Sequence, residues 1–141
     1  MKEVALIRRA TEQDIARIVE SRAGVSENAL SDPSKVTLED VRWLIVNPGI
    51  FVWEDESGTC GFSAADTRNG SIWALFVDER HCNRGIGRAL LERASTTVKS
   101  AGFDSIWLTT DPATRAEWLY RRAGWRLIGN QEGELHFERS L

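Results

Sequence analysis

The sequence predicts one α/β domain with a mixed sheet, spanning residues 1–141. A chain of 141 residues has the usual size of a single domain with a real core. Short apolar runs typical of strands alternate along the chain with segments whose apolar residues recur at helical spacing. One such helix directly follows a nearly all-apolar strand and a turn with two glycines. The expected order of elements is therefore β-α-α-β-β-β-α-β-α-β-β.

The N-terminal half is predicted to hold two helices and four strands. Thr11 can cap the free N–H groups of the first helix, and Asp14 suits its positive end. The second helix begins with the same pattern at Thr37, and Pro48 with its neighbours stops it. The polar stretch between them, residues 22–36, is expected to form a loop or a short helical turn. The strands are expected at residues 3–9, 50–53, 60–65 and 72–77, and the middle two form a hairpin.

The C-terminal half is predicted to hold two helices and three strands. Apolar residues at helical spacing from Ile86 to Val98 indicate the longest helix of the chain. A strand at residues 105–110 leads to a short helix that begins at Asp111-Pro112, with Asp111 as its N-cap. Residues 125–129 and 135–139 are expected to form a final hairpin. The six tryptophans are expected mostly in the core, with some in pocket walls.

The composition indicates a soluble globular protein. Apolar residues make up 42% of the chain and charged residues 28%, and the net charge is -3. An acidic chain argues against a nucleic-acid-binding surface. No apolar run has the length of a membrane span, and neither the cysteines (Cys60, Cys82) nor the histidines (His81, His136) have the spacing of metal ligands. We therefore expect a reduced, cytoplasmic protein without a metal ion and without nucleic-acid or membrane partners.

A loop with two glycines, Asn83-Arg84-Gly85-Ile86-Gly87-Arg88, stands where a strand gives way to a helix. The first turn of a helix has unpaired N–H groups and the positive end of the helix dipole. Glycines let this backbone approach an anion, and the two arginines add positive charge. A tight turn that merely needs small residues is the alternative. The chain lacks the P-loop pattern and the GxGxxG dinucleotide fingerprint, so a pyrophosphate bound in another way fits better.

Tyr120 lies on the short helix that follows the strand at residues 105–110. A parallel crossover would place that strand beside residues 72–77, with the starts of both following helices at one end of the sheet. A tyrosine hydroxyl there could serve as a general acid. A core tyrosine with its hydroxyl at the surface is the alternative, and Tyr120 alone does not decide between them.

Together these features resemble the GNAT superfamily of acetyl-CoA-dependent N-acetyltransferases. Three stretches carry the resemblance: Leu75-Phe76-Val77, Arg84 to Leu91, and Ala116 to Trp125. It implies a mixed, mostly antiparallel twisted sheet of six to seven strands with about four helices. It also implies that a primary amine attacks the acetyl thioester directly, in a ternary complex. The acceptor would be a small molecule or a peptide, and a homodimer is compatible with this reading.

The resemblance assigns roles to particular residues. The pantetheine arm of acetyl-CoA would bond to Leu75, Phe76 and Val77, where two parallel strands separate. The pyrophosphate would be held by Asn83, Arg84, Gly85, Ile86, Gly87 and Arg88. Tyr120 would protonate the departing CoA thiolate. Acceptor contacts are expected from Arg22, Glu27, Asn28 and Thr109.

Four positions depart from the usual pattern of this family. At one of them Asp78-Glu79 stands where a strand end often has a proline. Cys82 stands where an arginine or glutamine is usual, Ala113 where an asparagine is usual, and Trp125 where a phenylalanine is usual. Cys82 beside His81 also raises the alternative of a nucleophilic thiol, but adjacent residues rarely face each other correctly. Cys82 and Ala113 keep a second function open, that of a CoA-binding sensor or regulatory module with little catalysis.

Overall fold

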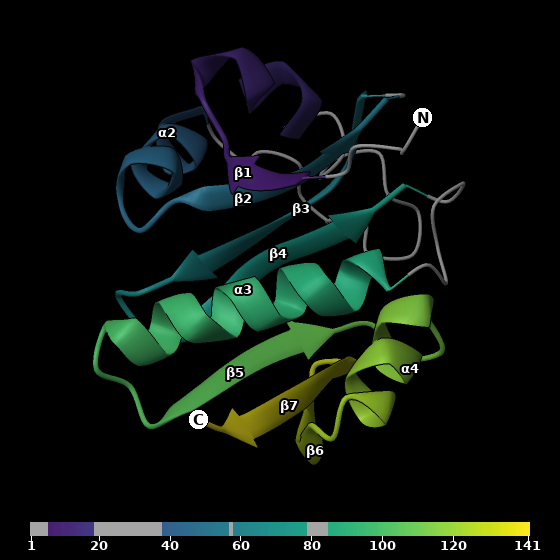
Figure 1. Cartoon of the computed structure of the whole chain (residues 1–141). Helices are drawn as coiled ribbons and strands as arrows, with labels where there is room; N and C mark the ends of the chain where they lie inside the picture. Colours follow the sequence, from purple (N-terminus) through teal and green to yellow (C-terminus); the bar gives the residue numbers. More distant parts are fainter. Residues whose placement is uncertain (1–5, 19–37, 57, 79–84) are drawn as a thin grey trace.

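A computed structural model describes residues 6–18, 38–56, 58–78 and 85–141 (Figure 1). One seven-stranded sheet runs through it in the order β1-β2-β3-β4-β5-β7-β6. Neighbouring strands are antiparallel throughout, apart from the parallel pair β4 and β5. The prediction of a mixed, mostly antiparallel sheet is therefore confirmed. The strands are β1 (Leu6–Arg9), β2 (Ile50–Asp55), β3 (Gly58–Asp66), β4 (Ser71–Val77), β5 (Ser105–Thr110), β6 (Arg126–Gln131) and β7 (Glu134–Ser140).

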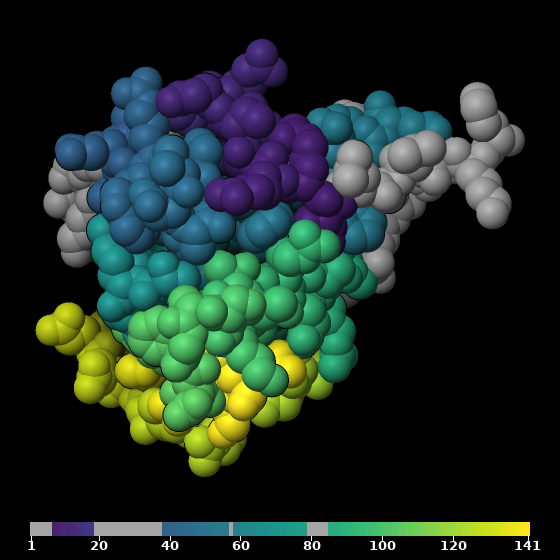
Figure 2. All heavy atoms as spheres, turned by 60° about the vertical axis from the view of Figure 1, so that its left-hand side comes forward, coloured from purple at the N-terminus to yellow at the C-terminus, as the bar shows by residue number. Residues whose placement is uncertain are grey.

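Helices cover both faces of the sheet, but over different strands. A 3-10 turn, η1 (Glu12–Asp14), continues into helical residues 15–18, and with α2 (Leu38–Val46) it packs against one face of β2 to β4. The long helix α3 (Ile86–Ser100) and α4 (Arg115–Arg122) pack against the opposite face. Figure 2 shows the N-terminal segment and α2 side by side, with α3 in green below them. Within the described residues, no helix is long and apolar enough to cross a membrane.

The predicted cap at the start of the first helical segment is confirmed. The Thr11 hydroxyl accepts from the Gln13 N–H at 3.3 Å, and the Asp14 carboxylate accepts from the Thr11 N–H at 2.8 Å. Arg8 also donates to both Asp14 and Glu54, at 3.0 to 3.1 Å. Burial acts to raise the pKa of Asp14, but the hydrogen bonds from Arg8 and Thr11 hold it below the ordinary value. This network fixes the first helical segment to β1 and β2.

The predicted start of the last helix is wrong, and the prediction that the tryptophans lie mostly in the core holds for some of them. Asp111-Pro112 does not begin α4. Ala113 adopts a left-handed backbone with φ 61°, so a continuous right-handed helix cannot run from residue 111 through residue 113. Thr114 is the actual N-cap, and its hydroxyl accepts from the Glu117 N–H at 3.2 Å. Of the six tryptophans, Trp125 is fully buried, Trp43 and Trp73 are partly buried against the core, and Trp118 is 58% exposed.

Candidate active site

The parallel strands β4 and β5 meet at one point and then separate. Within the described strands their ladder is limited to the pair Ser71 and Trp107, supported by the Trp107 N–H donating to the Gly70 carbonyl at 3.2 Å. The Trp107 indole N–H adds a bond to the Asn69 carbonyl at 3.0 Å. β4 is therefore anchored to β5 at its start, and within the described strands the β4–β5 ladder does not extend to Leu75, Phe76 or Val77.

The last three residues of β4 are apolar but only half-buried. Ala74 is 6% exposed, whereas Leu75, Phe76 and Val77 are all partly accessible. Their other edge is paired with β3 in regular register, opposite residues 61–63. Apolar side chains beside a strand edge that has no partner strand among the described residues are what an extended ligand with amide groups can bind, as an added strand does.

In the part of the chain that the structure describes, no side chain caps the start of α3 and no acidic residue lies in its first turn. Gly85 precedes it in the left-handed region, with φ 80°, and provides no side-chain cap. The first turn has no acidic residue and instead includes the exposed Arg88. By contrast, η1 and α4 each begin with a threonine cap and carry carboxylates in their first turns. The start of α3 is thus suited to an anion from outside the chain.

Gly87 brings three elements of this region together. A Cβ added there would lie 3.3 Å from Cδ2 of Leu119 on α4 and 3.5 Å from Cγ2 of Val77 on β4. Nothing lies within 4 Å of a Cβ added at Gly85. Gly87 therefore lies in close contact with α4 and β4, so a larger residue there requires Leu119 to move; the sequence prediction of anion approach did not include this role.

Tyr120 is placed by an aromatic cluster beneath α4. Its ring is 4% exposed and lies 5.6 Å from the Trp125 ring and 5.9 Å from the Phe137 ring, measured between centroids. Tyr120 is thus a core residue. The preceding residue, Leu119, lies near Gly87 at the start of α3, next to β4. α4 therefore joins the core to the region where β4 and β5 separate.

Ala113 precedes α4 at the position where an asparagine is usual. Its backbone N–H donates to the Glu117 carboxylate at 2.7 Å, and Arg121 donates to the same carboxylate at 2.7 Å. These bonds, that of Ala113 first, hold the pKa of Glu117 below its ordinary value. The spacing Thr114-x-x-Glu117 is a capping-box signature that could have located this helix start from sequence.

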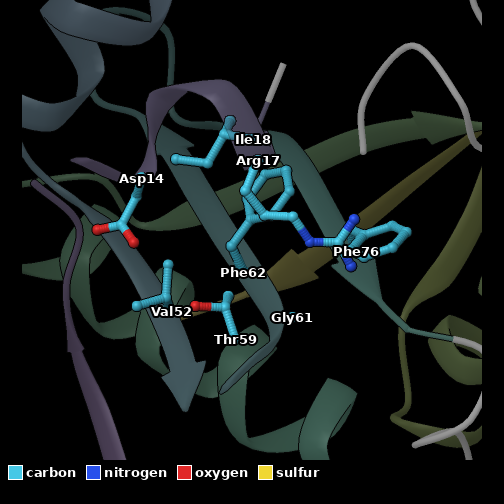
Figure 3. Close-up of a pocket in the computed structure, with 8 residues that line it drawn as sticks. All are labelled: Asp14, Arg17, Ile18, Val52, Thr59, Gly61, Phe62 and Phe76. Carbon is cyan, nitrogen blue, oxygen red and sulfur yellow. The ribbon is translucent and has the colours of Figure 1, made fainter. Parts of the chain in front are cut away.

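On the opposite face, Arg17 links the first helical segment to the end of β4. Its guanidinium lies 3.6 Å from the Asp78 carboxylate and 5.6 Å from the centroid of the Phe76 ring (Figure 3). The cleft beside it has a volume of about 10 Å³, which is room for a single water molecule rather than a substrate. Its lining residues are Asp14, Arg17, Ile18, Val52, Thr59, Gly61, Phe62 and Phe76.

The predicted site residues fall into three groups. Val77 lies near Gly87, and with Leu75 and Phe76 it forms the half-buried end of β4, while residues 85–88 form the start of α3. Thr109 is exposed on β5, on the sheet face away from α3 and α4. Arg22, Glu27, Asn28, Cys82, Asn83 and Arg84 lie outside the described residues. No cluster of three potential metal ligands occurs in the part of the chain that the structure describes.

Known proteins share this sequence pattern and this fold. Residues 9–125 match the model of the acetyltransferase (GNAT) family. Over 93 residues the chain is 32% identical to the mycothiol acetyltransferase of Propionibacterium freudenreichii subsp. shermanii; the match covers 60% of this chain and 30% of that protein's length.

Solved structures with this fold have low sequence identity. A GNAT-family acetyltransferase from Staphylococcus aureus Mu50 superposes with a TM-score of 0.79 at 19% identity, over 98% of this chain and 99% of that one. The structure of yncA from Salmonella typhimurium with its cofactor acetyl-CoA gives 0.75 at 17% identity, over 97% and 94%. The family match over most of the chain and the shared fold show that this protein belongs to the acetyltransferase (GNAT) family.

Proposed function

We propose that the protein transfers an acetyl group from acetyl-CoA to a primary amine by direct attack in a ternary complex, with Tyr120 as the general acid. The separation of β4 from β5 directly beside the uncapped start of α3 carries this proposal. It combines a strand edge for the pantetheine amides with a positive helix end for the pyrophosphate. A tight turn between a strand and a helix would need neither feature.

The described residues divide the binding of acetyl-CoA between them. Leu75 and Val77 would offer backbone groups and apolar contact to the pantetheine arm. The N–H groups of residues 86–88, with the Arg88 side chain, would bind the pyrophosphate. Arg84 and Asn83 belong to the same proposed loop. The bound molecule supplies the acetyl thioester, which the amine attacks.

Tyr120 has a role only if its hydroxyl reaches the leaving sulfur. α4 passes beside the proposed cofactor site, because Leu119 lies against Gly87 at the start of α3. Its ring is held on two sides by Trp125 and Phe137, so the hydroxyl direction is fixed by packing. A fixed donor near the developing thiolate charge favours the transition state more than the bound substrate.

The test compares Tyr120→Phe with Trp118→Phe, a change on the same helix at an exposed ring. Tyr120→Phe is expected to lower turnover on the order of 10²-fold while the Kd for CoA stays unchanged. Trp118→Phe is expected to leave turnover unchanged. Equal turnover of Tyr120→Phe and the unsubstituted protein would exclude the general-acid role.

A panel of primary amines with free-thiol detection addresses both the acceptor and the alternative function. The panel contains lysine, tyramine and a peptide with a free N-terminus, because the proposed acceptor is a small molecule or a peptide. Turnover with any of these amines supports the proposed acetyltransferase activity. Tight CoA binding without turnover on a wider panel would favour the sensor or regulatory module. A single domain, a cytoplasmic location and a homodimer stay predictions.

A further inference from the structure

In the C-terminal half of the sheet, the described helices cover one face and leave the other face open. Ile106 and Leu108 on β5, with Leu135 and Phe137 on β7, are buried in the cluster that α3 and α4 cover. Side chains alternate along a strand, so the residues between them point to the opposite face. These residues are Trp107 and Thr109 on β5 and His136 and Glu138 on β7, and none of them is buried.

His136 lies at the centre of this open face. It pairs in register with Thr109 on β5, which is exposed, and its ring centroid lies 5.2 Å from that of Trp107. On its other side it pairs with Gly129 on β6, where the register shifts. An added Cβ at Gly129 would meet nothing within 4 Å. The neighbouring strand therefore leaves space beside the imidazole, which Trp107 borders on the other side.

The strand register places His136 close to the point where β4 and β5 separate, which is the proposed acetyl site. Trp107 belongs to the pair that joins β5 to β4, and Thr109 lies two residues further along β5. Thr109 and His136 are thus side by side at the level where β4 and β5 separate. An amine on this open face would approach the separation from the side opposite α3 and α4.

We infer that His136 accepts the proton of the acceptor amine, on a floor formed by Thr109, His136 and Gly129. This inference rests on the proposed acetyl transfer. Imidazole is the side chain most often used to accept protons near neutral pH. The charged groups placed around it are Glu134 and Glu138 on β7, Arg126 on β6, which pairs with Glu138 at 3.3 Å, and Asp111 after β5.

A protonated amine loses two protons during the transfer. One passes to the His136 imidazole and then to solvent, which frees the nitrogen lone pair to attack the acetyl carbonyl carbon. The C–N bond forms, and the C–S bond breaks with its electron pair staying on sulfur. The nitrogen releases the second proton as the amide forms, which balances the proton that Tyr120 delivers to the thiolate.

The first experiment measures the pH profile of kcat/KM, using the fastest amine of the panel with acetyl-CoA. His136→Gln is expected to lower kcat/KM on the order of 10²-fold at pH 7 and to abolish the acidic limb of the profile. Glu138→Gln, a change on the same face, keeps the acidic limb. Added imidazole restores part of the rate of His136→Ala, which a purely structural role would not allow. The Kd for CoA and the thermal midpoint report whether each variant is folded.

The second experiment fills the space beside His136. Gly129→Val is expected to raise the KM for the amine at least 10-fold and to leave the Kd for CoA unchanged. A tenfold change corresponds to the loss of about 1.4 kcal/mol of binding free energy. A wild-type pH profile in His136→Gln would overturn the role of His136 while acetyl transfer stands. An unchanged KM for the amine in Gly129→Val would show that the amine does not bind on the floor formed by Thr109, His136 and Gly129. Absence of turnover in the unsubstituted protein on every amine would remove the proposed function and this role together.

Discussion

Ala113 holds a left-handed backbone, with φ 61°, while its N–H donates to the Glu117 carboxylate at 2.7 Å. The left-handed region costs a residue with a Cβ on the order of 1 kcal/mol, and asparagine tolerates it better than alanine. The asparagine that is usual at this position in the family therefore has a backbone reason as well as any contact with the cofactor. In this chain the hydrogen bond from Ala113 to Glu117 offsets part of the strain.

Ala113→Asn is expected to raise the free energy of unfolding by about 0.5–1 kcal/mol, because asparagine adopts this conformation with less strain. Urea unfolding measures the gain. If the amide also contacts acetyl-CoA, the KM for acetyl-CoA falls in Ala113→Asn. Ala113→Gly is the matched control, since it relieves the strain without adding an amide. Equal KM values for the two variants would exclude the amide contact.

Gly87→Val is expected to destabilise the protein by about 1–3 kcal/mol, because the added side chain meets Leu119 and Val77. In a Leu119→Ala background the same substitution is expected to cost less, since the nearest contact is gone. Urea unfolding of the four proteins of this double-mutant cycle gives the coupling. Additive costs would mean that Gly87 is not limited by Leu119, and a lost CoA thermal shift would then report on cofactor approach alone.

Elements specified by local signals could be predicted from the sequence, as β5 shows. Its observed bounds, Ser105–Thr110, match the prediction, because an apolar run follows the helix stop at Gly102. The Thr11 cap could be predicted because its partner Asp14 lies three residues away. The start of α4 was predicted at Asp111-Pro112 instead of at the Thr114-x-x-Glu117 signature, because an alanine at position 113 gives no sign of a left-handed backbone there.

The candidate site was predictable in its chain segments but not in its geometry. The glycines and the apolar strand marked the start of α3 and the end of β4. The separation of β4 from β5 depends on a pairing between residues 71 and 107, which sequence spacing does not specify. His136 was considered only as a possible metal ligand, because the residues beside it, Thr109 and Gly129, come from two other strands.

Asp66 is expected to make stability depend on pH in the acidic range. Hydrogen bonds from the Arg68 side chain and backbone, at 2.8 to 2.9 Å, hold the pKa of Asp66 below its ordinary value. A lowered pKa stabilises the folded state above the ordinary value, near pH 4, and this contribution is lost as pH falls through the folded pKa. Because Arg68 is half-exposed, the contribution is modest.

Asp66→Asn is therefore expected to lower the free energy of unfolding at pH 7 and to have a smaller effect at pH 3. Urea unfolding at both pH values measures the difference. Asp104→Asn, at an exposed position, controls for removal of a carboxylate. An equal effect of Asp66→Asn at the two pH values would show that its ionisation does not stabilise the fold.

Trp125 combines tight packing with an unsatisfied polar atom. It is 5% exposed, its ring contacts Tyr120, and its indole N–H has no hydrogen-bond partner among the described residues. A buried donor without a partner costs about 1–3 kcal/mol, while the smaller phenylalanine leaves a cavity with a cost of similar size. Trp125→Phe is therefore expected to change the free energy of unfolding by less than about 1 kcal/mol.

Trp125→Ala gives the comparison, since it removes the whole ring and is expected to cost about 3–5 kcal/mol. Tyr120 would lose one of its two ring contacts in Trp125→Ala but keep it in Trp125→Phe. Turnover should therefore fall in the alanine variant and persist in the phenylalanine variant, measured below the unfolding transition of both. A loss above about 2 kcal/mol in Trp125→Phe would mean that the indole N–H has a partner in solution, such as a bound water molecule.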